Sequence, residues 1–174
     1  AGNTYKLSGE YIVEEGATLH IEEGVKIIAV YDDIADYILV KQGGKINAVG
    51  TPDKPIVMTS EKEEPGAWGG IHICGRAHTN AEGGKGSSEI GGAVYGGNDD
   101  ADNSGTLQYI RLEYTGFAFD EEHEANGISF YSVGNGTIVD HCQAYKGSDD
   151  GFEFFGGSVN VSNLVAVSCS DDSF

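Results

Sequence analysis

The sequence repeats itself at intervals of 22 to 27 residues, and this repeat limits the folds that the chain can adopt. A shift of 22 residues places Val139 on Val161 and Asp150 on Asp172, so that GSDDGF and CSDDSF become equivalent. Shifts of 24 and 27 residues overlay NGISFYSV on DGFEFFGG and IVEEGATL on LVKQGGKI. Short apolar runs that recur in this way, with turns of Gly, Asn or Asp between them, are typical of a solenoid.

Among solenoids, the pattern favours an all-β, right-handed parallel β-helix of about 22–27 residues per coil. A leucine-rich repeat would need LxxLxLxxN spacing, and a β-sandwich would not repeat its register coil after coil. In a β-helix each coil supplies about three short strands, and every strand pairs with its equivalent one coil away. We therefore expect residues 1–174 to form a single domain in which Ile128, Phe152 and Phe174 stack inside the solenoid.

Two insertions interrupt the repeat. Residues 76–103 are rich in Gly, Ser, Asn and acidic residues and are too long for a turn, which predicts an inserted surface loop. The segment DEEHEA, residues 120–125, is a shorter insertion. Long loops on a solenoid often project from its binding face.

The C-terminal end of the sequence falls within the repeat. Phe174 occupies a predicted interior position, and no capping segment follows it. An uncapped end would expose core side chains and unpaired strand edges. We therefore expect the sequence to be a C-terminally incomplete fragment whose chain continues into further coils.

The composition is strongly acidic, with 28 Asp and Glu against 10 Lys and Arg and a net charge of −18. This charge repels nucleic acid and anionic lipid, and it favours cations or neutral ligands. The sequence contains no apolar run long enough to span a membrane. Cys74, Cys142 and Cys169 match no metal-binding spacing, so we interpret them as small buried hydrophobic residues.

Four segments resemble a family of secreted or surface-anchored parallel β-helix proteins of Bacteroidetes and marine bacteria. The resemblance extends over most of the chain from Tyr11 onward, and it implies the β-helix fold and a secreted or outer-membrane-associated, cell-surface location. It assigns no catalytic residue. The segments are YGGNDDADNSGTLQYIRLEYTG, PGAWGGIHICG, KINAVGTPDKPIVMTS and SDDGFEFFGGSVNVSNLVAVSCSDDSF.

A candidate metal site lies at Asp99, Asp100, Asp102 and Ser104, with Ca²⁺ as the expected ion. Oxygen ligands at alternate positions before a glycine resemble the beginning of a calcium loop. The loop is incomplete as an EF-hand, because Arg111 stands where a bidentate glutamate would be required. The alternative is a polar turn in which the Asp side chains bind their own backbone.

The second candidate site is an acidic ladder made of Asp149, Asp150, Asp171 and Asp172. Stacking would place equivalent carboxylates about 5 Å apart, which raises the pKa of at least one of them unless a cation intervenes. Such a separation suits a retaining glycosidase, so these residues could serve as acid, base or calcium ligands. Pectin-cleaving β-helix enzymes also carry Gly-His-Gly and Arg-x-Lys runs, which this sequence lacks. No catalytic residue is therefore assigned, and a cation ladder or a plain turn stays open.

Candidate ligand-binding residues are Tyr95, Tyr114, Tyr145 and Glu153. Outward aromatic rings on a flat parallel sheet can stack on sugar rings. The sequence alone does not assign each ring to the inner or outer face. Among the histidines, His20, His72 and His141 are expected at outward strand positions, and His78 and His123 in polar surface insertions.

The leading hypothesis is an extracellular, non-catalytic β-helix module that binds a glycan or a partner surface. The alternatives are a polysaccharide-degrading enzyme that uses the acidic ladder, and a structural stalk or adhesin. A cleft in which the ladder meets basic residues would favour the enzyme. An exposed strip of aromatic rings would favour glycan binding. The absence of both features would favour the stalk.

Overall fold

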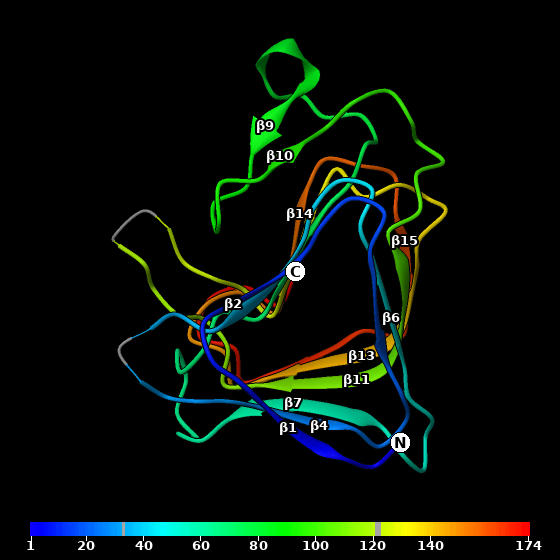
Figure 1. Ribbon diagram of the computed structural model, residues 1–174. Coiled ribbons are helices and arrows are strands. Elements are labelled where there is room, and N and C mark those ends of the chain that lie inside the picture. Colours follow the sequence, from blue (N-terminus) through cyan, green and yellow to red (C-terminus); the bar gives the residue numbers. More distant parts are fainter. Residues whose placement is uncertain (33, 121–122) are drawn as a thin grey trace.

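The computed structural model describes residues 1–32, 34–120 and 123–174, and it is an all-β, right-handed parallel β-helix. Figure 1 looks along the solenoid, so that strands of successive coils lie behind one another. Residues 121 and 122, part of the insertion predicted at 120–125, lie outside the described residues. Within the described ranges, no helix has the length and apolarity needed to cross a bilayer.

The first face of the solenoid is a parallel sheet in which every strand lies one coil from the next. Its outward positions carry His72, Ser129 and Glu153 in one row across three coils, because His72 pairs with Ser129 and Ser129 with Glu153. The strands, in order across the sheet, are β2 (Glu10–Val13), β5 (Tyr37–Val40), β8 (Ile71–Cys74), β12 (Ile128–Tyr131) and β14 (Phe152–Phe155).

The other two faces belong to one larger sheet, because its two longest strands bend and pair on both faces. Its strands are β1 (Thr4–Leu7), β3 (Thr18–Ile21), β4 (Lys26–Ala29), β6 (Lys45–Val49), β7 (Ile56–Ser60), β11 (Gly105–Glu113), β13 (Ile138–Tyr145), β15 (Asn160–Ser162) and β16 (Val165–Val167).

The bend between these two faces uses a left-handed residue in three successive coils. Tyr109, His141 and Asn163 have φ angles of 51°, 53° and 51°. A left-handed backbone costs about 1–2 kcal/mol for a residue other than glycine, so the paired segments on both sides must hold it. The Tyr109 and His141 rings also stack, with centroids 4.6 Å apart.

The strand registers confirm the repeat that was read from the sequence. Val139 pairs with Val161, Ile128 with Phe152 and Ile12 with Leu39, as the three shifts predict. The middle coils are longer than 22–27 residues, because Ile38 pairs with Ile71 and Ile71 with Ile128. The predicted coil length therefore describes the two ends of the solenoid and not its middle.

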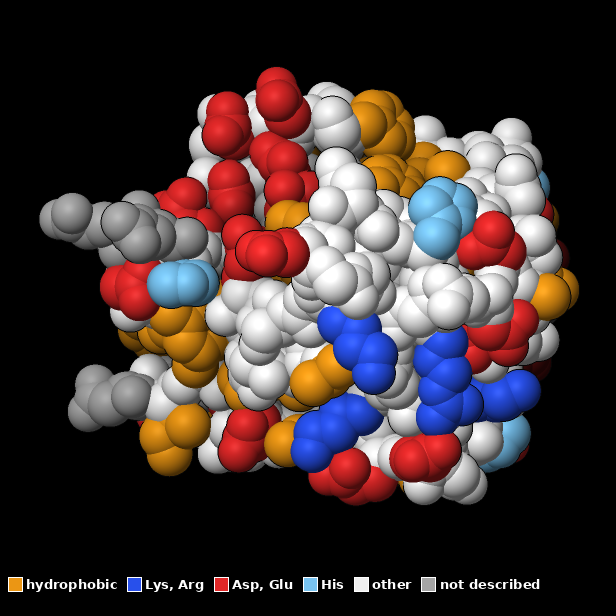
Figure 2. Space-filling view, turned by 90° about the horizontal axis from the view of Figure 1, so that it is seen from above, with side chains coloured by type: hydrophobic (Ala, Val, Ile, Leu, Met, Phe, Trp, Pro, Cys, Tyr) orange, Lys and Arg blue, Asp and Glu red, His pale blue; other side chains and the backbone are white. Residues whose placement is uncertain are grey.

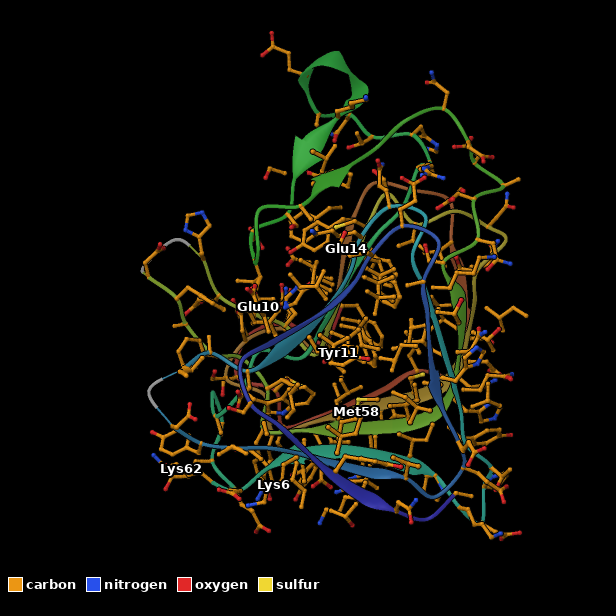
Figure 3. The ribbon with its side chains drawn as sticks, viewed as in Figure 1. Lys6, Glu10, Tyr11, Glu14, Met58 and Lys62 are labelled. Atoms are coloured by element: carbon orange, nitrogen blue, oxygen red, sulfur yellow. The ribbon has the colours of Figure 1, made fainter. Side chains whose placement is uncertain are left out.

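The core consists of side chains that fill the space between the three faces. Figure 3 shows the side chain of Met58 pointing into this space. Ile46, Ile71 and Phe130 have no exposed surface, and full burial of such a side chain contributes about 1.5–3 kcal/mol. Phe152 stacks on Phe174 with a centroid distance of 5.8 Å, as the predicted stack requires, although Phe174 itself is 63% exposed and not interior.

The cysteines behave as the sequence predicts in two of three positions. Cys74 and Cys142 are buried, whereas Cys169 is half-buried against the core. All three are free thiols. Burial raises the pKa of the Cys74 thiol and of the Cys142 thiol to about 12, so neither is a reactive thiolate.

Residues 76–103, where the sequence predicts an inserted surface loop, contain short regular elements. The segment contains a 3₁₀ turn (Glu82–Gly84) and an antiparallel hairpin of β9 (Gly86–Ser87) and β10 (Val94–Tyr95). Figure 1 shows this hairpin projecting beyond the first face.

The inserted hairpin closes a second hydrophobic cluster on the outside of the first face. Ile90 and Ala93 are buried, as are the outward residues of the sheet below them. The residues of this cluster are Tyr37, Leu39, Cys74, Ile90, Ala93, Tyr95, Ala125 and Tyr131. The first face therefore has apolar side chains on both sides, which explains why β5, β8 and β12 are buried along their whole length.

We expect Gly105→Ala to disrupt the join between the inserted segment and β11. Gly105 has a φ angle of 118°, and a methyl group there would collide with the Ile46 carbonyl group. The substitution should cost at least about 3 kcal/mol of unfolding free energy, measured by chemical denaturation. Gly83→Ala is the matched control, because Gly83 also has a positive φ but has nothing within 4 Å. Equal losses in the two variants would contradict the steric explanation.

Candidate functional site

The acidic ladder forms at the corner that precedes β14. The Gly151 amide donates a hydrogen bond to the Asp172 carbonyl oxygen at 3.0 Å. The Asp172 amide donates to Asp150 Oδ1 at 2.8 Å. These bonds place Asp150 beside Asp172 on successive coils, in the alignment that the shift of 22 residues predicts.

Three carboxylates of this ladder converge, and we call them the Asp triad: Asp149, Asp150 and Asp171. Each offers an oxygen atom, and these atoms lie within 4.8 Å of one another. Asp149 and Asp150 are half-buried, whereas Asp171 is exposed. None of the ion pairs formed by the described residues includes a member of the Asp triad.

The pKa values of two carboxyls of the Asp triad are raised, because the groups are partly buried and no positive charge among the described residues compensates for this. Burial, followed by the charges of Glu124, Asp150 and Asp171, raises the pKa of Asp149 to about 6. Burial also raises the pKa of Asp150, although the Asp172 amide acts in the opposite direction. A cation at this corner would relieve both effects, and Ca²⁺ is a cation that prefers carboxylate oxygens.

The Asp triad is part of a wider acidic patch. Figure 2 shows acidic side chains gathered on this face of the molecule. Electrostatic coupling connects the triad with Glu124 and with Glu153 on β14, and connects Glu153 in turn with Glu89 of the inserted hairpin. Burial and then the charge of Glu89 raise the pKa of Glu153 to about 7. Glu153 is therefore partly protonated near neutral pH.

Sequence reasoning missed three members of this site: Glu89, Glu124 and Asn126. Asn126 Nδ2 donates a hydrogen bond to Glu153 Oε2 at 2.6 Å. The Gly127 amide donates to the Asp150 carbonyl oxygen, so Asn126 stands one coil before Asp150 at the same corner. The shift of 24 residues already aligns Asn126 with Asp150, and this alignment could have identified it. Glu89 carries no comparable signal, because the inserted hairpin does not follow the repeat.

The predicted calcium loop, Asp99 to Ser104, uses its side chains to bind backbone amides. Asp100 Oδ1 accepts the His78 amide at 3.0 Å, and Asp102 Oδ2 accepts the Arg76 amide at 3.0 Å. Asp99 Oδ1 accepts the Ala101 amide two residues on, as in an Asx turn. Ser104 is buried. These contacts anchor the inserted segment, and calcium at this loop stays a prediction.

The candidate ligand-binding tyrosines do not form an exposed strip. Tyr95 and Tyr114 are each only 9% exposed, which corrects the expectation of outward rings at these two positions. Tyr95 packs on Tyr131 at 5.3 Å, and Tyr114 has a φ angle of 63° at a corner. Tyr145 is half-buried on the larger sheet, with the Arg111 guanidinium 4.5 Å above its ring. Of the four predicted residues, Glu153 belongs to the acidic patch.

The histidines differ from the prediction at one position. His72 points away from the core as expected, but it has no exposed surface, because rings of Tyr37 and Tyr131 cover it. Burial lowers the pKa of His72 to about 4, so the ring is neutral. His20 is exposed, His141 is largely exposed and pairs with Asp140, and His78 lies 2.7 Å from Asp100.

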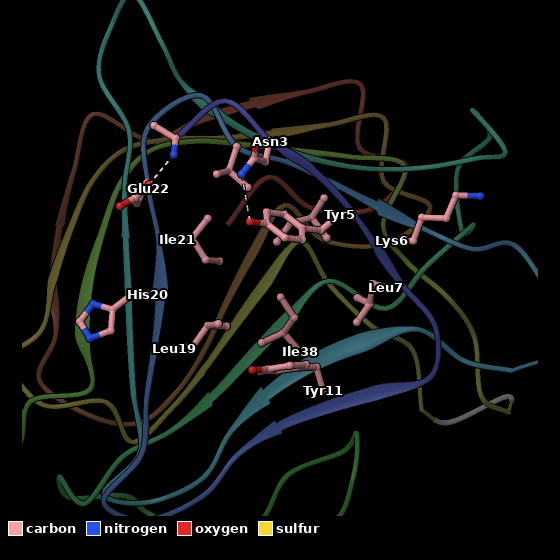
Figure 4. Close-up of a pocket in the computed structure, with 13 residues that line it drawn as sticks. Asn3, Tyr5, Lys6, Leu7, Tyr11, Leu19, His20, Ile21, Glu22 and Ile38 are labelled. Carbon is pink, nitrogen blue, oxygen red and sulfur yellow. Dashed lines mark hydrogen bonds and ion pairs between the residues drawn. The ribbon is translucent and has the colours of Figure 1, made fainter.

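A separate pocket lies at the N-terminal coil (Figure 4). Its walls are mainly apolar, with Leu7, Leu19 and Ile38 among them. The side-chain Nδ2 of Asn3 donates to the Tyr5 hydroxyl, and the N-terminal ammonium pairs with Glu22. This pocket brings together fewer reactive groups than the acidic patch.

The fold and the acidic corner define a parallel β-helix protein with a candidate cation site. The chain matches the pectate-lyase-like β-helix domain over residues 1–174, and it belongs to that family. Domains of this kind can be catalytic or binding modules. The chain has no significant match among curated proteins or solved structures.

We expect the unfolding free energy in EDTA to fall as the pH rises from 5 to 8. The folded-state pKa values of Asp149 and Glu153, about 6 and about 7, lie above the ordinary carboxyl values. Protonation of these two carboxyls stabilises the folded state fully at pH values below their unfolded-state pKa values. This stabilisation is lost as the pH rises through their folded-state pKa values.

The variant that combines Asp149→Asn with Glu153→Gln should show a flatter pH dependence in chemical denaturation. The difference should amount to about 1 kcal/mol or less for each group, because both are partly solvent-screened. Asp53→Asn, on an exposed turn between β6 and β7, should keep the wild-type slope. An unchanged slope in the double variant would refute the role of these two carboxyls.

Proposed function

We propose that this chain is a non-catalytic, extracellular carbohydrate-binding domain of a bacterial surface protein, with Ca²⁺ held by the Asp triad. The observation that supports this proposal is the convergence of three carboxylates at a solvent-accessible corner, without a cationic partner among the described residues. Ca²⁺ takes six to eight oxygen ligands, so sugar hydroxyls can complete its coordination. The net charge of −18 agrees with a cation as the first ligand and a neutral or cationic saccharide as the second.

A polysaccharide-degrading enzyme is the second candidate, and one observation favours it. The carboxyls of Asp149 and Glu153 have pKa values of about 6 and about 7, close to the range of a general acid. Against this, the described part of the acidic patch pairs with no Lys or Arg that could hold an acidic substrate or accept its proton. We therefore favour binding, and a stalk or adhesin is the third possibility.

Adding Ca²⁺ should raise the melting temperature of the wild-type protein at pH 7.5, as measured by differential scanning calorimetry. At a concentration 100 times the dissociation constant, binding to the folded state contributes about 2.7 kcal/mol. Asp150→Asn should largely remove this gain, because it takes away a charged ligand of the Asp triad. Asp53→Asn should keep it. An equal calcium effect in Asp150→Asn and wild type would place the ion elsewhere, for example at the Asp99–Ser104 loop.

Incubation with neutral and acidic polysaccharides tests the binding function directly. We expect the protein to be depleted onto an insoluble glycan with Ca²⁺ and to stay in solution with EDTA, without release of new sugar ends. Asp150→Asn should bind weakly, and Asp53→Asn should bind like wild type. New sugar ends that disappear in Asp150→Asn would make the protein an enzyme. If the protein is not depleted and no new sugar ends appear, the result would favour the stalk.

A further inference from the structure

Two Asn-Gly pairs lie on either side of β12: Asn126-Gly127 before the strand and Asn135-Gly136 after it. In an Asn-Gly pair the backbone nitrogen of the glycine can approach the side-chain amide of the asparagine, because glycine has no side chain to hinder the approach and restricts the backbone least. The two pairs have the same intrinsic chemistry. A difference in their reactivity must therefore come from the structure.

The first pair is held inside the solenoid. Asn126 is only 1% exposed, and its Nδ2 atom donates hydrogen bonds to Ser129 Oγ and to Glu153 Oε2. The Gly127 amide donates to the Asp150 carbonyl oxygen at 3.0 Å. Both the side-chain amide and the backbone nitrogen that would attack it are fixed, so a reaction at this pair requires local opening of the fold.

The second pair lies at the centre of an exposed turn, which is closed by a hydrogen bond of 3.1 Å from the Thr137 amide to the Gly134 carbonyl oxygen. Asn135 is exposed, and its hydrogen bonds to described residues use its backbone amide, not its side chain. The Gly136 amide donates to the Asp102 carbonyl oxygen at 3.2 Å, the long limit for such a bond. Among these contacts, a reaction at the turn needs the release of this weak hydrogen bond alone.

We propose that Asn135 is a site of spontaneous deamidation in the folded protein, and that Asn126 is protected from the same reaction. The Gly136 backbone nitrogen loses its proton to solvent and attacks Asn135 Cγ. A cyclic succinimide forms as the side-chain nitrogen leaves as ammonia. Water then opens the ring at one of its two carbonyl carbons, and the products are aspartate and isoaspartate. The sequence of steps consumes water, releases ammonia and involves no oxidation or reduction.

The position of this turn gives the modification a structural effect. The Asn135 amide donates to the Asp100 carbonyl oxygen at 2.8 Å, and Ser158 Oγ from the following coil donates to the same oxygen at 2.7 Å. Isoaspartate inserts an extra methylene group into the backbone here. Either product adds a negative charge to a turn that already contacts Asp100 and Asp102. The modified protein should therefore hold the end of the inserted segment less firmly and melt at a lower temperature.

Incubation of the wild-type protein at neutral pH, with samples taken over several weeks, tests the site by mass spectrometry. Trypsin releases residues 112–146 as one peptide that contains both Asn-Gly pairs. Fragmentation of this peptide shows which asparagine has gained about 1 Da, the change from an amide to a carboxyl group. In the folded protein, conversion should be at least about tenfold faster at Asn135 than at Asn126, which reacts only from a locally open state. In denaturant the two rates should agree within about threefold, because the protection is lost.

Asn135→Gln is the matched variant, since it keeps an exposed amide but would have to form a larger, more slowly closing ring. Its position 135 should stay unmodified, and its melting temperature should not change on storage, whereas that of stored wild-type protein should fall. Equal rates at the two asparagines in the folded protein would overturn the proposal. So would an Asn135 that stays intact in the folded protein while both sites react in denaturant. An unchanged melting temperature after conversion would refute the effect on the inserted segment.

Discussion

Backbone hydrogen bonding between successive coils is the constraint on which the rest of this structure depends. Each strand of the first face pairs in parallel with its equivalent, so a side chain of one type lies above the same position of the next coil. This arrangement builds the interior from rows such as Ile128 beside Phe152. It also builds the Asp triad, because the stacking that favours an apolar row brings like charges together when the row is acidic. The acidic corner is thus a direct result of the fold.

The registers at the ends of the solenoid could be predicted because inward apolar residues and turn residues recur together. Val139 and Val161 share a position, and so do the corners that follow them. The inserted hairpin could not be predicted in the same way. Ile90 and Tyr95 pack against Tyr37 and Tyr131, which lie far away in the sequence and follow a different spacing. A sequence repeat predicts contacts between equivalent residues of successive coils. The inserted segment has no equivalent residues in another coil, so the repeat does not predict its contacts.

The candidate site also contains one part that the repeat predicts and one part that it does not. The ladder of Asp149 and Asp150 over the next coil was visible in the sequence, because residue types are preserved between coils. Asn126 occupies the same corner one coil earlier, and the shift of 24 residues aligns it with Asp150, but an Asn does not continue a row of carboxylates and so was not selected as a candidate. The candidate tyrosines Tyr95 and Tyr114 are buried, and the sequence could not show this. The repeat does not assign a face to each ring, and it does not show whether another segment covers a face, as the hairpin of Tyr95 does.

The 3₁₀ turn of the inserted segment has a consequence for how such a domain can diversify. A methyl group added at Gly83 or Gly84 would meet no other atom within 4 Å, and this turn pairs with no described strand of the solenoid. Residues can be added or removed there without shifting the register of any coil. The solenoid and the inserted segment can therefore vary separately, so that one solenoid can carry different surface loops.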